Sequence, residues 1–123
     1  MKLQTRQIMV TVVAIAGFLS LGGCLGNPKK QLASHISVSF PGIDAERMVF
    51  ALETQGVLVA TGSACAANKG TRSHTLTAMG LSDSEADGSL RISLGKLSNE
   101  ENIKRAAEII SKTVRAEFKR IQK

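Results

Sequence analysis

The 123-residue sequence predicts an α+β fold, a small sheet of about three strands covered by helices. Apolar and polar residues alternate at 36–40 and again at 89–94, which is the two-residue period of a strand with one buried face. From 103 to 121, apolar residues recur every three or four positions and predict one buried stripe along a helix of about six turns. Strands and helices in this order form a sheet with helices packed on it.

Cap and turn residues define the elements in the first half of this region. Asp44 is a plausible N-cap for a helix over 45–55, and Gly56 stands where a left-handed residue would end that helix. The short apolar run at 57–60 predicts a strand. Residues 61–72 are small or polar and bury little surface, so we expect a mobile loop there.

The second half shows two capping boxes, in which a serine precedes a glutamate by three positions. Ser73 is expected to cap a short helix that runs to Met79. Ser82 and Glu85 then predict one further helical turn, and Ser98 with Glu101 predicts the start of the long C-terminal helix.

The composition excludes several classes of function. Aromatic residues make up only 3% of the chain, and there is no Trp or Tyr, so a stacking platform for bases is not expected. Two cysteines exclude a four-cysteine zinc site, and no metal site is expected. The net charge of +6 comes largely from 104–123, where seven basic residues accompany two acidic ones. On a helix such spacing indicates a solvated face, so nucleic acid is not an expected partner.

Residues 1–26 differ from the rest of the chain. Two basic residues lie within the first seven positions, and nineteen uncharged residues follow at 8–26. A basic start, a short apolar run and then small residues are typical of a secretory signal peptide. A spanning helix needs about 20 apolar residues, so an uncleaved membrane anchor stays open as an alternative. We therefore expect a signal-like or anchor segment at 1–26 and a domain at 27–123.

Cys24 is the candidate for lipidation. The residues LGGC at 21–24 resemble the lipobox of bacterial lipoproteins, in which the cysteine receives lipid after cleavage. This resemblance predicts membrane association through residues 1–26.

Cys65 is the candidate nucleophile. Its neighbours in the 61–72 loop are glycine, alanine and serine, which offer little bulk to bury a thiol. Lys69 and Arg72 follow closely, and nearby cations favour the thiolate, the reactive form of cysteine. The alternative, on the general behaviour of cysteines, is a buried core residue.

Three further residues are candidates for a site around Cys65. Arg91 falls on the polar side of the predicted strand, and its planar guanidinium suits bidentate binding of a carboxylate. Ser63 and His74 lie near Cys65 in sequence and are candidates for supporting roles, although covering the short helix is the favoured role for His74.

Three motifs in order, SFPGID at 39–44, TGSAC at 61–65 and SLRISLG at 89–95, resemble the C-terminal domain of cysteine desulfurases. These are pyridoxal-phosphate enzymes of the class V aminotransferase family. The resemblance runs from about residue 26 to the end, about four-fifths of the chain. It implies the small C-terminal domain of a fold-type I pyridoxal-phosphate enzyme, of the subgroup with an extended mobile catalytic loop.

The resemblance also implies a chemistry for the candidate residues. In the family, the cofactor weakens the carbon–sulfur bond of L-cysteine, a loop thiolate takes the sulfur as a persulfide, and alanine leaves. Cys65 matches this nucleophile, and Arg91 matches the residue that holds the substrate carboxylate. An acceptor such as an iron–sulfur scaffold protein is the implied partner.

The cofactor-binding residues of the family have no counterpart in this sequence. The family's large domain supplies a lysine, an aspartate and a histidine to pyridoxal phosphate, and none can be placed here. We therefore expect a truncated desulfurase-like domain that does not bind the cofactor alone and is inactive alone, as a gene remnant or with a separate large domain as partner. The alternative is a small lipid-anchored envelope protein that keeps the fold without the chemistry. A functional signal would export the chain, and otherwise the cytoplasm is expected, as for the family.

Overall fold

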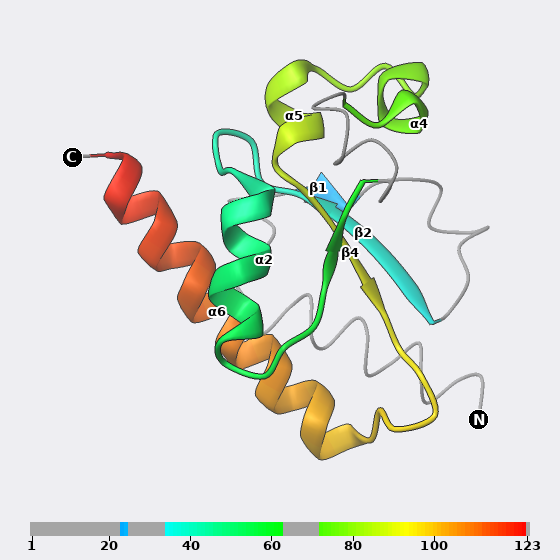
Figure 1. The fold of residues 1–123 in the computed structure, drawn as a ribbon, viewed down its shortest axis with the longest axis vertical. Helices are drawn as coiled ribbons and strands as arrows, with labels where there is room; N and C mark the ends of the chain where they lie inside the picture. Colours follow the sequence, from blue (N-terminus) through cyan, green and yellow to red (C-terminus); the bar gives the residue numbers. More distant parts are fainter. Residues whose placement is uncertain (1–22, 25–33, 63–71, 123) are drawn as a thin grey trace.

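The computed structural model describes residues 23–24, 34–62 and 72–122, and the structural statements below concern these residues. Two longer helices pack on one face of a four-stranded sheet, and two short helices lie at one end of it (Figure 1). The elements in chain order are β1 (Gly23–Cys24), β2 (His35–Ser39), α2 (Ala45–Glu53), β3 (Ala60–Thr61), α4 (His74–Ala78), α5 (Asp83–Asp87), β4 (Ser89–Ser93) and α6 (Glu100–Ile121).

The sheet has the strand order β1-β2-β4-β3, and each neighbouring pair is antiparallel. Its centre is the β2–β4 ladder, where five residue pairs run from His35 opposite Ser93 to Ser39 opposite Ser89. The predicted α+β fold is therefore confirmed. The short strand β1, which pairs with the end of β2, was not expected from the sequence.

The strand predicted at 57–60 begins later in the structure. We expected a strand at 57–60, whereas β3 comprises only Ala60 and Thr61, opposite Arg91 and Leu90. The reason lies in the end of α2, where the Val57 amide donates a hydrogen bond to the Leu52 carbonyl at 3.0 Å. Because this amide closes the helix, the sheet ladder begins later.

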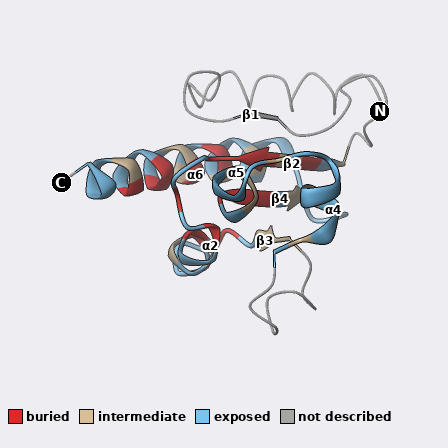
Figure 2. Ribbon diagram, turned by 90° about the horizontal axis from the view of Figure 1, so that it is seen from above, coloured by how far each residue is buried: buried red, intermediate tan, exposed pale blue. Residues whose placement is uncertain are grey.

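The hydrophobic core lies between one face of the sheet and helices α2 and α6. Figure 2 shows buried positions on β2 and β4 and on the facing turns of both helices. The four largest fully buried side chains are Phe40, Met48, Leu52 and Leu90. The predicted apolar stripe of α6 is buried through Ile110 and Val114.

Two of the predicted helix caps are confirmed. The Asp44 carboxylate accepts hydrogen bonds from the amides of Glu46 and Arg47, at 2.9 and 3.2 Å. Ser82 and Glu85 form the expected capping box at the start of α5.

Two other expected starts differ from the prediction. Ser73 occupies the N-cap position of α4, but its side chain makes no capping hydrogen bond. The predicted box of Ser98 with Glu101 is wrong, because Asn99 caps α6 by accepting from the Asn102 amide at 2.8 Å. The Ser98 hydroxyl instead accepts a hydrogen bond from the Gly95 amide at 3.0 Å, in the preceding turn.

Helix α5 is held to the end of the sheet by hydrogen bonds from two buried serines. The hydroxyls of Ser39 and Ser89, one on each central strand, both donate to the Glu85 carbonyl at 2.6 Å. The short helix therefore has a fixed place beside β2 and β4. None of the described helices is long and apolar enough to cross a membrane.

Candidate functional site

Arg91 lies on the sheet face opposite the core, as the alternation of β4 predicts. Its neighbour Leu90 is 1% exposed, whereas Arg91 is exposed. The strand register places Ser37 on one side of Arg91 and Ala60 on the other. Small neighbours leave room above the strand for the long arginine side chain.

The Arg91 guanidinium contacts the residue that precedes the 63–71 segment. Its Nη1 donates a hydrogen bond to the Gly62 carbonyl oxygen at 3.0 Å. Gly62 also lies against Ser73, since a Cβ placed on Gly62 would be 3.3 Å from the Ser73 Cβ. The two chain ends that flank residues 63–71 therefore meet beside Arg91.

The structure describes two of the other predicted site residues, His74 and Cys24. Cys65 and Ser63 lie outside the described residues, so their predicted roles stay predictions. His74 begins α4 with an exposed side chain. Cys24 belongs to β1 opposite Val38, and its lipidation stays a prediction.

Arg72 is paired with acidic side chains of α5, and its expected proximity to Cys65 stays a prediction because Cys65 lies outside the described residues. We expected it to stand near Cys65 as a cation that favours the thiolate. In the structure it pairs with Asp87 at 2.7 Å and with Asp83 at 3.3 Å. The hydrogen bond to Asp87 is the main cause of a raised pKa for Arg72. Because two carboxylates compensate its charge, Arg72 offers a weaker field to a thiol than a lone cation would.

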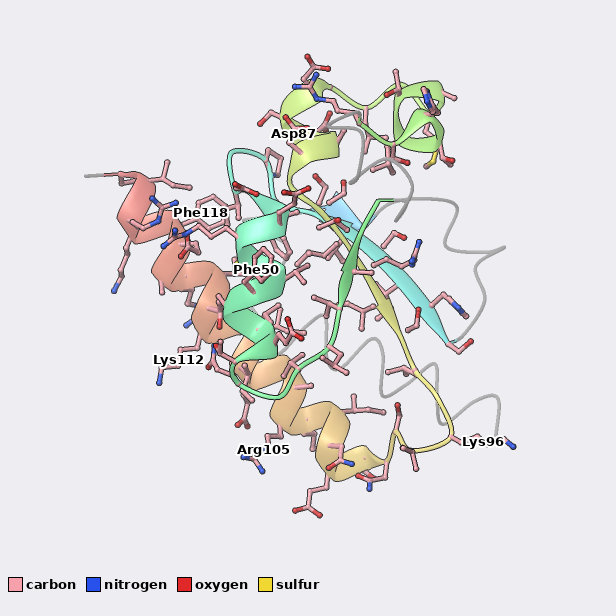
Figure 3. The ribbon with its side chains drawn as sticks, in the orientation of Figure 1. Phe50, Asp87, Lys96, Arg105, Lys112 and Phe118 are labelled. Atoms are coloured by element: carbon pink, nitrogen blue, oxygen red, sulfur yellow. The ribbon has the colours of Figure 1, made fainter. Side chains whose placement is uncertain are left out.

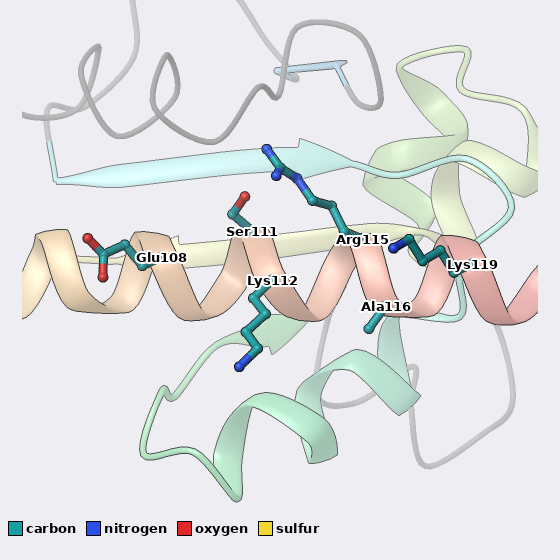
Figure 4. A pocket seen from close by; sticks show the side chains of 6 residues that line it. All are labelled: Glu108, Ser111, Lys112, Arg115, Ala116 and Lys119. Carbon is teal, nitrogen blue, oxygen red and sulfur yellow. The ribbon is translucent and has the colours of Figure 1, made fainter.

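The described residues do not fit pyridoxal phosphate. The lysines of α6 extend from the helix that covers the core face of the sheet, as Figure 4 shows for Lys112 and Lys119. Lys96 follows β4 and points outward (Figure 3), and Lys104 pairs with Glu100 at 2.8 Å. Within the described ranges, no lysine therefore shares a site with Arg91. The same residues contain no cluster of three or more metal-ligating side chains.

The model of the family described as aminotransferase class V matches residues 2–106, so the chain belongs to the class V aminotransferase family. It is 36% identical over 89 residues to the cysteine desulfurase IscS of Methanosarcina thermophila, covering 72% of this chain and 22% of that protein. The IscS of Clostridium botulinum strain Hall is 37% identical over 94 residues, covering 74% of this chain and 24% of that protein. The chain thus spans less than a quarter of the length of these relatives.

Solved structures confirm the fold. A NifS-like protein superposes with a TM-score of 0.74 at 24% identity, covering 94% of this chain and 28% of the other. A NifS-like protein from Rickettsia africae gives a TM-score of 0.69 at 20% identity, covering 98% and 29%. The resemblance to cysteine desulfurases that the three motifs carry is therefore confirmed at the level of family and fold.

Proposed function

We propose that the chain is the sulfur-carrying small domain of a cysteine desulfurase, in which Cys65 holds a persulfide and Arg91 binds the carboxylate of L-cysteine. The observation that carries this proposal is the hydrogen bond from Arg91 to the Gly62 carbonyl. It links the candidate carboxylate-binding residue directly to the chain that leads to Cys65.

The sequence distance between Gly62 and Cys65 limits how far the thiol can be from Arg91. Cys65 follows Gly62 by three positions. Three residues of extended chain span at most about 10 Å. This short separation in sequence supports the proposal that Cys65 and Arg91 serve the same site.

Arg91 retains the donors that a carboxylate needs. The contact with Gly62 uses Nη1, and the described residues form no hydrogen bond to its Nε and Nη2. A guanidinium edge with two parallel donors suits a carboxylate in bidentate geometry. Arg91 can therefore hold Gly62 and a substrate carboxylate at the same time.

The covalent step is a sulfur transfer without net oxidation. The Cys65 thiolate attacks the terminal sulfur of a persulfide donor, a new sulfur–sulfur bond forms, and the donor's sulfur–sulfur bond breaks as its thiolate leaves. In the full reaction with L-cysteine, a separate large domain would supply pyridoxal phosphate, and an iron–sulfur scaffold protein would accept the sulfur. This chain would then be inactive as a desulfurase when alone.

The test compares two alkylating reagents that differ in one carboxylate. Iodoacetate and iodoacetamide both lose iodide to a thiolate, so a change in the pKa of Cys65 affects both rates alike. We define the carboxylate preference as the ratio of the iodoacetate rate to the iodoacetamide rate at Cys65, divided by the same ratio for glutathione. Because a cation near the thiol attracts the charged reagent, we expect a preference of about five.

The variant Arg91→Gln should lower the carboxylate preference to about one, because only the cation is removed. Arg91→Lys should give an intermediate value, since it keeps the charge without the planar pair of donors. Arg105→Gln, which removes an exposed cation on α6, is the matched control and should change nothing. An unchanged ratio in Arg91→Gln would remove Arg91 from the site. Peptide mass spectrometry separates alkylation at Cys65 from alkylation at Cys24.

A second prediction concerns the cofactor. Purified chain mixed with pyridoxal phosphate should show no stable absorption band of an aldimine, because the described lysines are solvent-exposed and share no site with Arg91. The measurement is an absorption spectrum after gel filtration. A persistent yellow adduct on one defined lysine would contradict the proposal that the cofactor needs another domain.

The alternative function is a small lipid-anchored envelope protein that keeps the fold without the chemistry. The residues LGGC at 21–24 favour it, because they would place lipid on Cys24 after cleavage of a signal at 1–26. In that case residues 27–123 would form an exported, membrane-associated domain. The two functions differ in whether Cys65 takes up sulfur.

A further inference from the structure

The sheet face opposite the core is polar along both central strands. At one end of this face Ser39 and Ser89 are buried, because both hydroxyls donate to the Glu85 carbonyl of α5. Beyond α5 the face opens, so that Ser37 on β2 is half-buried and Arg91 on β4 is exposed. The residues next to α5 therefore form an accessible polar floor around Arg91.

Ser37 is the cross-strand partner of Arg91. In an antiparallel ladder, hydrogen-bonded residue pairs alternate with non-hydrogen-bonded pairs, in which the side chains are closer together. The Phe40 amide donates to the Gly88 carbonyl at 2.9 Å, so these two residues form a hydrogen-bonded pair. Ser37 and Arg91 lie three positions away along each strand, so they form a pair of the closer kind, with Cα atoms about 4.5 Å apart.

Both side chains keep donors for a ligand. Among the described residues, the Ser37 hydroxyl forms no hydrogen bond, and Arg91 donates only through Nη1, to the Gly62 carbonyl at 3.0 Å. Nε and Nη2 form the opposite edge of the guanidinium, so this edge is turned away from Gly62. Gly62 follows β3, and β2 and β3 flank β4 on opposite sides. The edge with two parallel donors is therefore on the side of β4 where Ser37 lies.

We propose that Ser37 is a second carboxylate-binding residue, whose hydroxyl donates to the carboxylate that Nε and Nη2 of Arg91 hold. The inference rests on the proposed function, because it adds a residue to the carboxylate site assigned there to Arg91. The two oxygens of a carboxylate have about four lone-pair sites, so they can accept a third hydrogen bond besides the two from the guanidinium. Donors from two neighbouring strands then fix the orientation of the amino acid as well as its charge.

Two other polar side chains on this face are poorer candidates. Ser93 lies two residues from Arg91 on the same strand, which is about 7 Å along β4. His35 lies opposite Ser93 and is thus a diagonal neighbour of Arg91, and its Nδ1 is 2.9 Å from the Ser34 hydroxyl oxygen. Ser37 is therefore assigned to the site, and Ser93 supplies a control.

The test measures binding of L-alanine to the full-length chain. L-alanine carries the carboxylate of the proposed substrate and has no thiol, so no sulfur chemistry interferes. The measurement is a titration followed by the NMR shifts of the β2 and β4 backbone amides, and alaninamide, which lacks the carboxylate, is the comparison ligand. We expect saturable shifts with a dissociation constant in the millimolar range for L-alanine and no saturable shifts with alaninamide.

Ser37→Ala should weaken the binding of L-alanine about three- to ten-fold, because it removes one hydrogen bond to a charged acceptor. Ser37→Thr should restore the affinity of the unmodified chain, since threonine keeps the hydroxyl and suits a strand. Ser93→Ala is the matched control, which removes an exposed hydroxyl from the same face and should leave the affinity unchanged. Arg91→Gln should abolish saturable binding. The spectrum of each variant without ligand shows whether its fold is kept.

The outcomes separate the inference from the proposed function. An unchanged affinity in Ser37→Ala, alongside loss of binding in Arg91→Gln, would overturn the inference and leave the proposed role of Arg91 standing. Equal weakening in Ser37→Ala, Ser37→Thr and Ser93→Ala would indicate a general effect on the sheet face and would also overturn it. Binding that survives Arg91→Gln, or no saturable shift in the unmodified chain, would refute the carboxylate site of the proposed function and the inference with it. The sulfur uptake of the chain is measured separately and would not be decided by these results.

Discussion

A chain that carries Cys65→Ser is expected to take up no sulfur from a low-molecular-weight persulfide donor, whereas the unmodified chain gains one sulfur atom on Cys65. The serine hydroxyl has nearly the same size but is a poor nucleophile at neutral pH, and it cannot form the new sulfur–sulfur bond. Mass spectrometry of the peptide that contains position 65 measures the added sulfur. The expected effect is complete loss.

Cys24→Ser is the matched control for this experiment. It removes the other cysteine of the chain and should leave sulfur uptake at Cys65 unchanged. If sulfur uptake is lost in Cys24→Ser and kept in Cys65→Ser, the reaction belongs to Cys24 and the proposed role of Cys65 is refuted. An unmodified chain that acquires no sulfur on Cys65 would favour the alternative, a domain that keeps the family fold without its chemistry.

The parts of the fold that the sequence predicts are those set by local chemistry. The alternation at 36–40 and 89–94 follows from burial of one sheet face, so β2 and β4 are found where the pattern places them. Asp44 and Ser82 act as caps at the positions that the local spacing predicts. Ser98 fails as a cap because the turn at Gly95 uses its hydroxyl, and this competition is not visible in the spacing.

The candidate site is predictable only in part, because some of its contacts join residues that are far apart in the sequence. Alternation along β4 places Arg91 on the open face, because Leu90 must be buried. The contact of Arg91 with Gly62 joins residues 29 positions apart, and the pair of Arg72 with Asp87 spans 15 positions. Such contacts depend on how β3 and α5 sit against the sheet. Two aspartates one turn apart on α5 were the signal that could have indicated a partner for Arg72.

Gly88→Ala is expected to destabilise the domain strongly. A Cβ on Gly88 would lie 2.1 Å from the Phe40 carbonyl oxygen and 2.7 Å from its carbonyl carbon. These atoms belong to the backbone, and they cannot move easily because the Phe40 amide donates to the Gly88 carbonyl at 2.9 Å and the Phe40 side chain is fully buried. We expect a loss of about 3 kcal/mol in the free energy of unfolding. This is a large share of the stability of a small domain.

Denaturant unfolding measures this loss, and Gly95→Ala is the control. A Cβ on Gly95 would meet no atom within 4 Å, so its free energy of unfolding should stay within about 0.5 kcal/mol of the unmodified chain. Equal stability of the Gly88 and Gly95 variants would show that β2 and β4 tolerate separation at this end. Gly88 directly precedes β4, the strand that carries Arg91. The close approach of Gly88 to the Phe40 backbone therefore also fixes the position of the strand from which the Arg91 side chain extends.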